Sequence, residues 1–363
     1  MANATSEQVK EQLKTFIDPY LEKDLDSARC VKNVVVDGNK ATIDIELGFP
    51  HQGYEEELKK AIKETVAKTD GIDEVEVNLS SRIVTHAVQK GVKPIAGVKN
   101  IIAVASGKGG VGKSTTTVNL ALALAAEGAR VAVLDADIYG PSIPRMLGIS
   151  GKPESEDGES LNPMVNHNLQ AMSIGFLVDD DSPMIWRGPM VTQALEQLFK
   201  DTRWDDVDYL VVDLPPGTGD VQLTLAQKIP VSGAVIVTTP QDIALLDARK
   251  GLKMFDKVNV PVLGVIENMS IHICSKCGHE ERVFGEGGGK RMSDEEHVTL
   301  LGDLPLDMSI RELADNGKPT VIAEPDGRIT QMYIEMARKI AAKLALKVQD
   351  FSNKFPSIVI KND

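Results

Sequence analysis

The sequence contains no long hydrophobic run and few cysteines. No apolar stretch approaches the roughly 20 residues that a helix needs to cross a bilayer. Residues 1–6 also lack the basic-then-apolar pattern of a secretory signal. Three cysteines in 363 residues cannot form a disulfide framework. We therefore expect a soluble protein of the cytoplasm that has no membrane partner.

Basic charge is also in short supply. The 40 Lys and Arg residues are outnumbered by 53 Asp and Glu, which gives a formal net charge of −13. Such a chain offers no broad positive surface for a phosphate backbone, so we expect no nucleic-acid partner. The 42% of apolar residues are ample for a packed core, and the length suggests two domains or one large one.

The segment 107–114, GKGGVGKS, lies between an apolar run at 101–105 and a helical pattern that begins at Thr116. It fits G-x-x-x-x-G-K-[ST], in which backbone N–H groups curl round a phosphate, a lysine neutralises it and a hydroxyl binds Mg²⁺. The helix N-terminus adds a favourable dipole. We predict an ATP and Mg²⁺ site that is formed by Gly107, Lys108, Gly109, Gly110, Val111, Gly112, Lys113, Ser114 and Thr115.

From residue 100 onward, apolar strands alternate with helical patterns. This alternation predicts an α/β fold, a mostly parallel P-loop NTPase sheet with helices on both faces. We expect strands at 101–106, 130–135, 169–174, 208–213, 233–238 and 262–266, and a short one near 299–301. Active groups should lie where such strands end. Asp137 follows one strand and Asp213 ends another, and Asp213 fits the Mg²⁺-associated carboxylate of this fold.

Residues 1–85 predict a separate small α+β domain. Ser6 can cap a helix whose apolar face runs through Phe16 and Ile17, and a hairpin, a second helix and a third strand follow. Residues 86–99 have the scattered Gly and Pro of a linker, 100–350 form the ATPase domain, and 351–363 are a C-terminal tail. Near the C-terminus, Ser309 begins a predicted capping box.

The pair Cys274-x-x-Cys277 indicates metal or redox chemistry in a reducing compartment. Two cysteines half-fill a tetrahedral sulfur site, and a two-fold axis would supply the other two. Iron-sulfur and zinc are both open from the residues alone. His272 and His279 flank the pair, so a Cys2His2 zinc site within one subunit is the rival hypothesis.

A second lysine, Lys108, follows the first glycine of the loop. By this feature the segment resembles the deviant P-loop ATPases of the MinD/ParA and nitrogenase iron protein group. The motifs that follow along the chain resemble the Mrp/ApbC family of iron-sulfur cluster carriers, and residues 1–85 are similar to the small domain often fused to them. These motifs are DxDIYGPS at 135–142, DLPPGTGD at 213–220, ENMS at 267–270 and CxxCG at 274–278.

The resemblance implies a homodimeric ATPase that carries a 4Fe-4S cluster and transfers it to apo iron-sulfur proteins. Lys108 would reach the partner's nucleotide, Lys113 would bind phosphate, and Asp137 would orient or activate the attacking water. Asn268 would touch the adenine, and Cys274 and Cys277 of two subunits would hold the cluster. A nucleotide-gated zinc scaffold and a MinD/ParA-like positioning ATPase are the alternatives.

Overall fold

The apolar runs after residue 97 form one twisted sheet in the computed structural model, which describes residues 4–89, 92–178, 188–274 and 276–347. Among the described residues this sheet has eight strands. They are β6 (Val98–Ala105), β7 (Val131–Asp135), β8 (Met164–Asn166), β9 (Leu169–Ser173), β10 (Val207–Asp213), β11 (Gly233–Thr238), β12 (Val262–Glu267) and β15 (Leu300–Asp303). The predicted tail 351–363 lies outside the described residues.

The strand order is β15-β12-β11-β6-β10-β7-β9-β8, and every neighbouring pair is parallel except β8 and β9. Each strand predicted in this region is present, and the antiparallel edge strand β8 was not predicted. Strands β7, β10 and β11 are buried along their whole length, which requires cover on both faces of the sheet. The predicted α/β fold is therefore confirmed.

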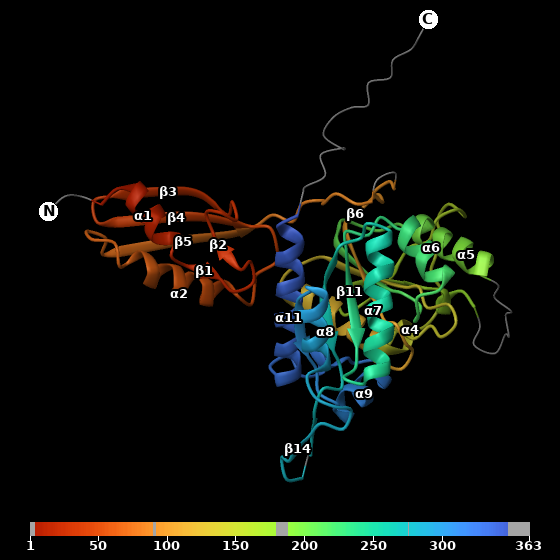
Figure 1. Ribbon diagram of the computed structural model, residues 1–363. Coiled ribbons are helices and arrows are strands. Elements are labelled where there is room, and N and C mark those ends of the chain that lie inside the picture. Colours follow the sequence, from red (N-terminus) through yellow and green to blue (C-terminus); the bar gives the residue numbers. More distant parts are fainter. Residues whose placement is uncertain (1–3, 90–91, 179–187, 275, 348–363) are drawn as a thin grey trace, which may run out of the picture.

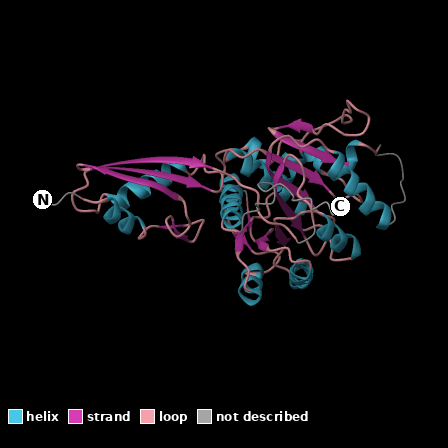
Figure 2. Cartoon of the chain, turned by 90° about the horizontal axis from the view of Figure 1, so that it is seen from above, coloured by secondary structure: helices cyan, strands magenta, loops and turns pink. Residues whose placement is uncertain are grey.

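Helices form the outer layers of this unit (Figures 1 and 2). Helices α3 and α11 pack on each other, and α7 packs on β11 beside α6 and α8. No helix among the described residues is long and apolar enough to cross a membrane. The helices are α3 (Lys113–Ala126), α4 (Ile143–Met146), α5 (Gly188–Asp201), α6 (Asp220–Lys228), α7 (Asp242–Lys257), α8 (Gly288–Glu296), α9 (Met308–Asp315), α10 (Thr320–Ala323) and α11 (Arg328–Ala345), with a 3-10 turn at Ile174–Phe176.

Residues 4–81 form the small unit on the left of Figure 1. Its elements are α1 (Ser6–Leu13), β1 (Ile17–Asp18), β2 (Lys23–Asp24), β3 (Val31–Asp37), β4 (Lys40–Leu47), α2 (Glu55–Val66) and β5 (Glu74–Ser81). Strands β3 and β4 make the predicted hairpin, and β5 pairs with β4 in parallel after the α2 crossover. The small α+β unit is thus present as predicted.

The predicted boundaries of two helices are wrong. Helix α1 ends at Leu13 instead of continuing through Phe16 and Ile17, because the chain turns there into the short strand β1. Thr5, not Ser6, caps α1 and makes a capping box with Gln8. Asp307, not Ser309, caps α9 by accepting a hydrogen bond from the Ser309 N–H, so the expected capping box is not formed.

A buried ion pair of the large unit, which holds the eight-stranded sheet, contacts the small unit. Arg338 of α11 donates two hydrogen bonds to Glu127, which ends α3, and its Nη1 donates to the Tyr20 hydroxyl at 3.1 Å. The guanidinium also lies over the rings of Tyr20 and Tyr54. A Cβ on Gly53 would stand 2.5 Å from a Glu127 carboxylate oxygen, so only glycine permits this close approach.

The segment between the two units is partly built into the large unit. His86 is buried, and its Nδ1 lies 2.9 Å from the Asn100 side-chain oxygen. The Gln89 amide donates to the carbonyl of Ala226 at 2.8 Å. The division into a domain at 1–85, a linker at 86–99 and an ATPase domain at 100–350 remains our proposal.

We predict that Arg338→Ala lowers the free energy of unfolding by about 3–5 kcal/mol, because it leaves the Glu127 carboxylate buried without its partner. Arg311→Ala is the control, since it removes an exposed pair with Glu312 and should cost under about 1 kcal/mol. Urea unfolding of both variants measures the difference. Equal stability of the two variants would contradict this role for the Arg338–Glu127 pair.

Candidate functional site

The loop between β6 and α3 has the backbone that a phosphate-binding loop needs. Gly110 and Gly112 both have φ near +83°, a left-handed conformation that residues with a Cβ rarely adopt. A Cβ on Gly107 would stand 2.3 Å from the Asp247 carbonyl oxygen, so the loop packs directly on α7. Lys113 begins α3, which places the helix N-terminus at the loop, and Ser114 and Thr115 follow in its first turn.

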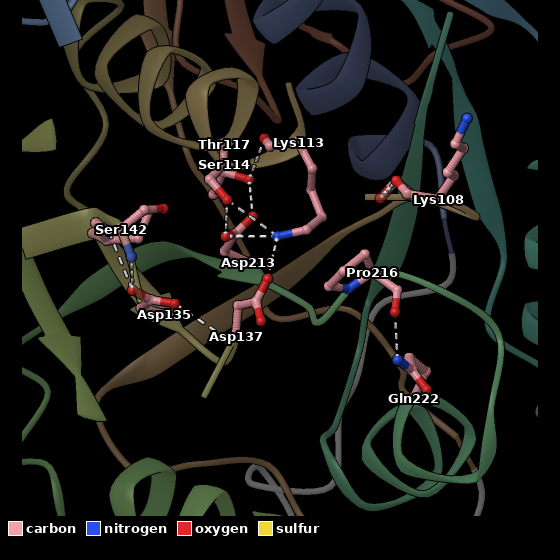
Figure 3. Close-up of polar contacts among 12 residues, drawn as sticks. Lys108, Lys113, Ser114, Thr117, Asp135, Asp137, Ser142, Asp213, Pro216 and Gln222 are labelled. Atoms are coloured by element: carbon pink, nitrogen blue, oxygen red, sulfur yellow. Dashed lines mark hydrogen bonds and ion pairs between the residues drawn. The ribbon is translucent and has the colours of Figure 1, made fainter. Parts of the chain in front are cut away.

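Asp213, at the end of β10, gathers the polar groups of this loop (Figure 3). Its Oδ2 lies 2.7 Å from the Lys113 Nζ and accepts a 2.6 Å hydrogen bond from the Ser114 hydroxyl. Its Oδ1 accepts a 2.7 Å hydrogen bond from the Thr117 hydroxyl. Asp213 and Lys113 are both buried, so each charge depends on the other for neutralisation.

Thr117 is a member of this cluster that we did not predict from the sequence. Thr117 lies one helical turn after Lys113, and its hydroxyl lies 3.0 Å from the Lys113 carbonyl oxygen, which accepts a hydrogen bond from it. The i, i+4 spacing places a side chain one turn further along the same helix face. That spacing alone could not show that the Thr117 hydroxyl meets a carboxylate 96 residues away.

Two aspartates after β7 have different environments. The Asp137 Oδ2 lies 3.7 Å from the Lys113 Nζ, and burial raises the pKa of Asp137 above its usual value. Asp135 is fully buried and accepts hydrogen bonds from the backbone of Asp137 and Ser142, at 3.1 and 3.0 Å. Burial, helped by the nearby Asp213 charge, raises the pKa of Asp135 to about 7. Asp137 thus faces Lys113, while Asp135 fixes the turn that follows.

The loop after β10 is tied to the phosphate-binding loop through its backbone. The Gly217 N–H donates to the Ser106 carbonyl at 2.8 Å, and the Ser106 hydroxyl donates to the Lys108 carbonyl at 2.9 Å. The Gln222 amide closes the loop by donating to the Pro216 carbonyl at 2.7 Å (Figure 3). A change in either loop therefore reaches the other.

Lys108 does not join the cluster around Asp213. It is exposed, and its amine points away from that cluster in Figure 3. Asn268, directly after β12, does reach the loop from another strand end. Its amide donates to the Val111 carbonyl at 2.8 Å, and its own N–H donates to the Thr238 carbonyl.

Cys274 and Cys277 lie far from this cluster, on a hairpin between β13 (His272–Ile273) and β14 (Glu280–Glu281) that projects from the large unit (Figure 1). The Cys274 carbonyl accepts from the Gly278 N–H, which closes the turn. Backbone N–H groups of Lys276 and Cys277 hold the pKa of the Cys274 thiol below its usual value. Both thiols are solvent-accessible and free.

The rival Cys2His2 site is not assembled in the part of the chain that the structure describes. No group of three or more His, Cys, Asp or Glu side chains there could hold a metal ion. The Nδ1 of His272 instead lies 3.2 Å from the Leu306 carbonyl. One chain therefore offers two sulfur ligands from its hairpin.

The donors around Asp213 fit Mg²⁺. This ion prefers oxygen ligands, keeps several waters and is usually bound by one or two protein groups together with substrate phosphates. The Ser114 hydroxyl and the Asp213 carboxylate are oxygen donors 2.6 Å apart beside a phosphate-binding loop. Neither needs a third protein ligand, because phosphates and water complete such a shell.

Comparison with known protein families assigns the two units separately. Residues 97–341 match the family described as NUBPL iron-transfer P-loop NTPase, and residues 6–79 match a family described as iron-sulfur cluster assembly protein. The iron-sulfur cluster carrier protein of Escherichia coli is 52% identical over 333 residues, which cover 92% of this chain and 90% of that protein. The mouse iron-sulfur cluster transfer protein NUBPL is 52% identical over 254 residues, covering 69% and 80%.

Solved structures agree on the fold. A nucleotide-binding protein from Archaeoglobus fulgidus in complex with ADP is 36% identical, with a TM-score of 0.56 over 64% of this chain and 90% of that one. The cell division ATPase MinD of Pyrococcus furiosus has a TM-score of 0.51 at 23% identity, over 66% of this chain and 98% of its own, and shows the fold alone. With a match over 97–341, the chain belongs to the NUBPL iron-transfer P-loop NTPase family.

Proposed function

We propose that this protein is an ATP-hydrolysing iron-sulfur cluster carrier, which binds a 4Fe-4S cluster between two subunits and transfers it to apo-proteins. The observation that carries the proposal is the solvent-accessible Cys274/Cys277 pair, which offers two thiols on a chain with a complete phosphate-binding loop. The names of the E. coli and mouse relatives, a cluster carrier and a cluster transfer protein, support the same cargo.

For hydrolysis, we assign the charged residues around the loop by their contacts. Lys113, now paired with Asp213, exchanges that partner for the phosphates of ATP. Ser114 and Asp213 would hold Mg²⁺, which would offset the negative charge of the phosphates. Asp137, whose Oδ2 lies 3.7 Å from the Lys113 Nζ, orients the attacking water. Its raised pKa favours acceptance of a proton from that water.

Two incomplete features of one chain support the proposed dimer. A cluster held by four thiolates needs two Cys274/Cys277 pairs, and a two-fold axis supplies them. Lys108 is exposed at the loop and turned away from its own Asp213, so it is free to meet a nucleotide of the partner subunit. ATP-dependent pairing of subunits would complete both sites together.

A nucleotide-gated zinc scaffold is the second candidate, because two cysteines from each of two chains also make a tetrahedral zinc site. The iron-transfer family match favours iron-sulfur. A MinD/ParA-like positioning ATPase has only fold-level support, since the MinD structure is 23% identical.

We predict that the two loop lysines have separate phenotypes. Lys113→Ala should weaken ATP binding about 30-fold or more, because it removes a desolvated charge partner of the phosphates. Lys108→Ala should keep ATP affinity but lower turnover by up to ~10³-fold, which is the contribution that a positive charge supplied in trans can make. Titration with a fluorescent ATP analogue and phosphate release measure the two effects.

Lys60→Ala is the control for these variants, because Lys60 is a highly exposed lysine of α2 in the small unit. Thermal melts establish that each variant is folded. Normal turnover in a Lys108→Ala dimer would refute the cross-subunit role of Lys108.

We also predict that Cys274→Ala and Cys277→Ala each abolish stable cluster binding while ATP affinity is retained. The wild-type dimer should carry about two irons per chain, as expected for one 4Fe-4S cluster held by two chains. Cys30→Ala is the matched control, since burial raises the pKa of that thiol to about 11 and keeps it unreactive. Visible absorption and iron content after anaerobic reconstitution provide the measurement. A full cluster on the Cys274→Ala/Cys277→Ala protein would exclude this pair as the ligands.

A further inference from the structure

One short stretch of chain connects the phosphate-binding loop to the cysteines. Asn268, whose amide touches the loop, precedes Cys274 by six residues. The stretch crosses from the end of β12 to the beginning of the cysteine hairpin. A change in the phosphate-binding loop can therefore reach the hairpin through the hydrogen bonds of this stretch.

At the loop end, Asn268 is held by the shape of the loop itself. Its Nδ2 donates to the Val111 carbonyl at 2.8 Å, and a Cβ on Gly112 would stand 2.2 Å from the same nitrogen. The side chain is buried, so it has little room to move independently. A change in the path of the loop at Val111 must displace Asn268.

At the hairpin end, residues 270–272 run beside residues 304–306 and are hydrogen-bonded to them. The N–H and the hydroxyl of Ser270 donate to the Leu304 carbonyl at 2.9 and 3.0 Å. The Leu306 N–H donates to the Ile271 carbonyl at 2.7 Å, and His272 contacts the Leu306 carbonyl. Movement at Ser270 is therefore passed on to the hairpin as a unit.

Between these two ends lies Met269, whose backbone is in the left-handed region with φ +57°. A residue with a Cβ adopts this conformation only where its surroundings enforce it. Here the Met269 N–H donates to the Asn268 side-chain oxygen at 2.9 Å, so the Met269 backbone is fixed to the side chain that contacts the loop. Met269 is thus a stiff connection rather than a flexible one.

We propose that Met269 is a positioning residue that couples the state of the phosphate-binding loop to the placement of Cys274 and Cys277. The inference rests on the proposed function. In the structure Lys113 and Ser114 are bonded to Asp213. Nucleotide phosphates compete with Asp213 for Lys113, and Mg²⁺ competes with it for Ser114, so the loop takes a second arrangement when nucleotide binds. Because the backbone at Met269 is stiff, a displacement of Asn268 also displaces Ser270 and the hydrogen-bonded segment that leads to the hairpin. ATP binding thereby changes the rate at which the cluster is released.

The test compares cluster release with and without nucleotide. Anaerobic, cluster-loaded protein is mixed with a ferrous-ion chelator, and the release rate is measured with Mg-ATP and without nucleotide. For the wild type we expect the two rates to differ about fivefold or more, as is typical of coupled sites. In Met269→Gly, where glycine removes the conformational constraint, the ratio should fall to about one.

Two further variants separate the backbone from other effects. Met269→Ala removes the side chain but keeps a residue with a Cβ in the left-handed conformation, so the ratio should be kept. Asn259→Gly makes the same kind of change at another left-handed residue, φ +56°, away from this stretch, and should also keep the ratio. Loss of the ratio in Met269→Ala would assign the coupling to side-chain contacts and overturn the backbone role.

A wild-type ratio of one, or an unchanged ratio in Met269→Gly, would overturn the proposal. ATP turnover and cluster absorbance are recorded on the same samples. If both are present while the ratio is one, the coupling alone fails. If the protein binds no cluster or does not hydrolyse ATP, the proposed function fails first, and the two cases are distinguished.

Discussion

The structure depends on one buried carboxylate, that of Asp213, at the end of the central strand β10. Its two oxygens hold Lys113, Ser114 and Thr117, so the phosphate-binding loop, the first turns of α3 and the sheet share one electrostatic centre. Removing one partner of a buried charge pair typically costs about 3–5 kcal/mol, so this centre must be satisfied in every state of the protein. In the proposed function, phosphates that attract Lys113 are therefore accompanied by a cation beside Asp213.

Around this centre the parallel sheet brings distant segments to one edge. Asp137 after β7 and Asn268 after β12 reach the same loop because strands that run in parallel end on the same side. The cysteines take no part in that edge and lie on a projecting hairpin, where their thiols are accessible to solvent, as the proposed dimer and cluster transfer require (Figure 1). In our account the protein separates its energy source from its cargo and connects them through residues 268–274.

Much of this arrangement could be predicted from the sequence, because the signals are local. The loop glycines, Lys113 and the aspartates at strand ends follow from short patterns whose geometry is fixed by the fold. Contacts between distant residues could not be predicted in this way: Arg338 meets Glu127 across 211 positions, and no periodicity marks either residue. The end of α1 was also missed, because Phe16 and Ile17 continue the apolar pattern although the backbone turns into β1.

The central claim, a cluster shared between two subunits, is tested most directly by the mass of the intact complex under anaerobic, non-denaturing conditions. Mass spectrometry of the reconstituted protein should show two chains with the added mass of one 4Fe-4S cluster, and monomers without any cluster. A complete cluster on single chains, or a dimer whose added mass is that of zinc, would contradict the account.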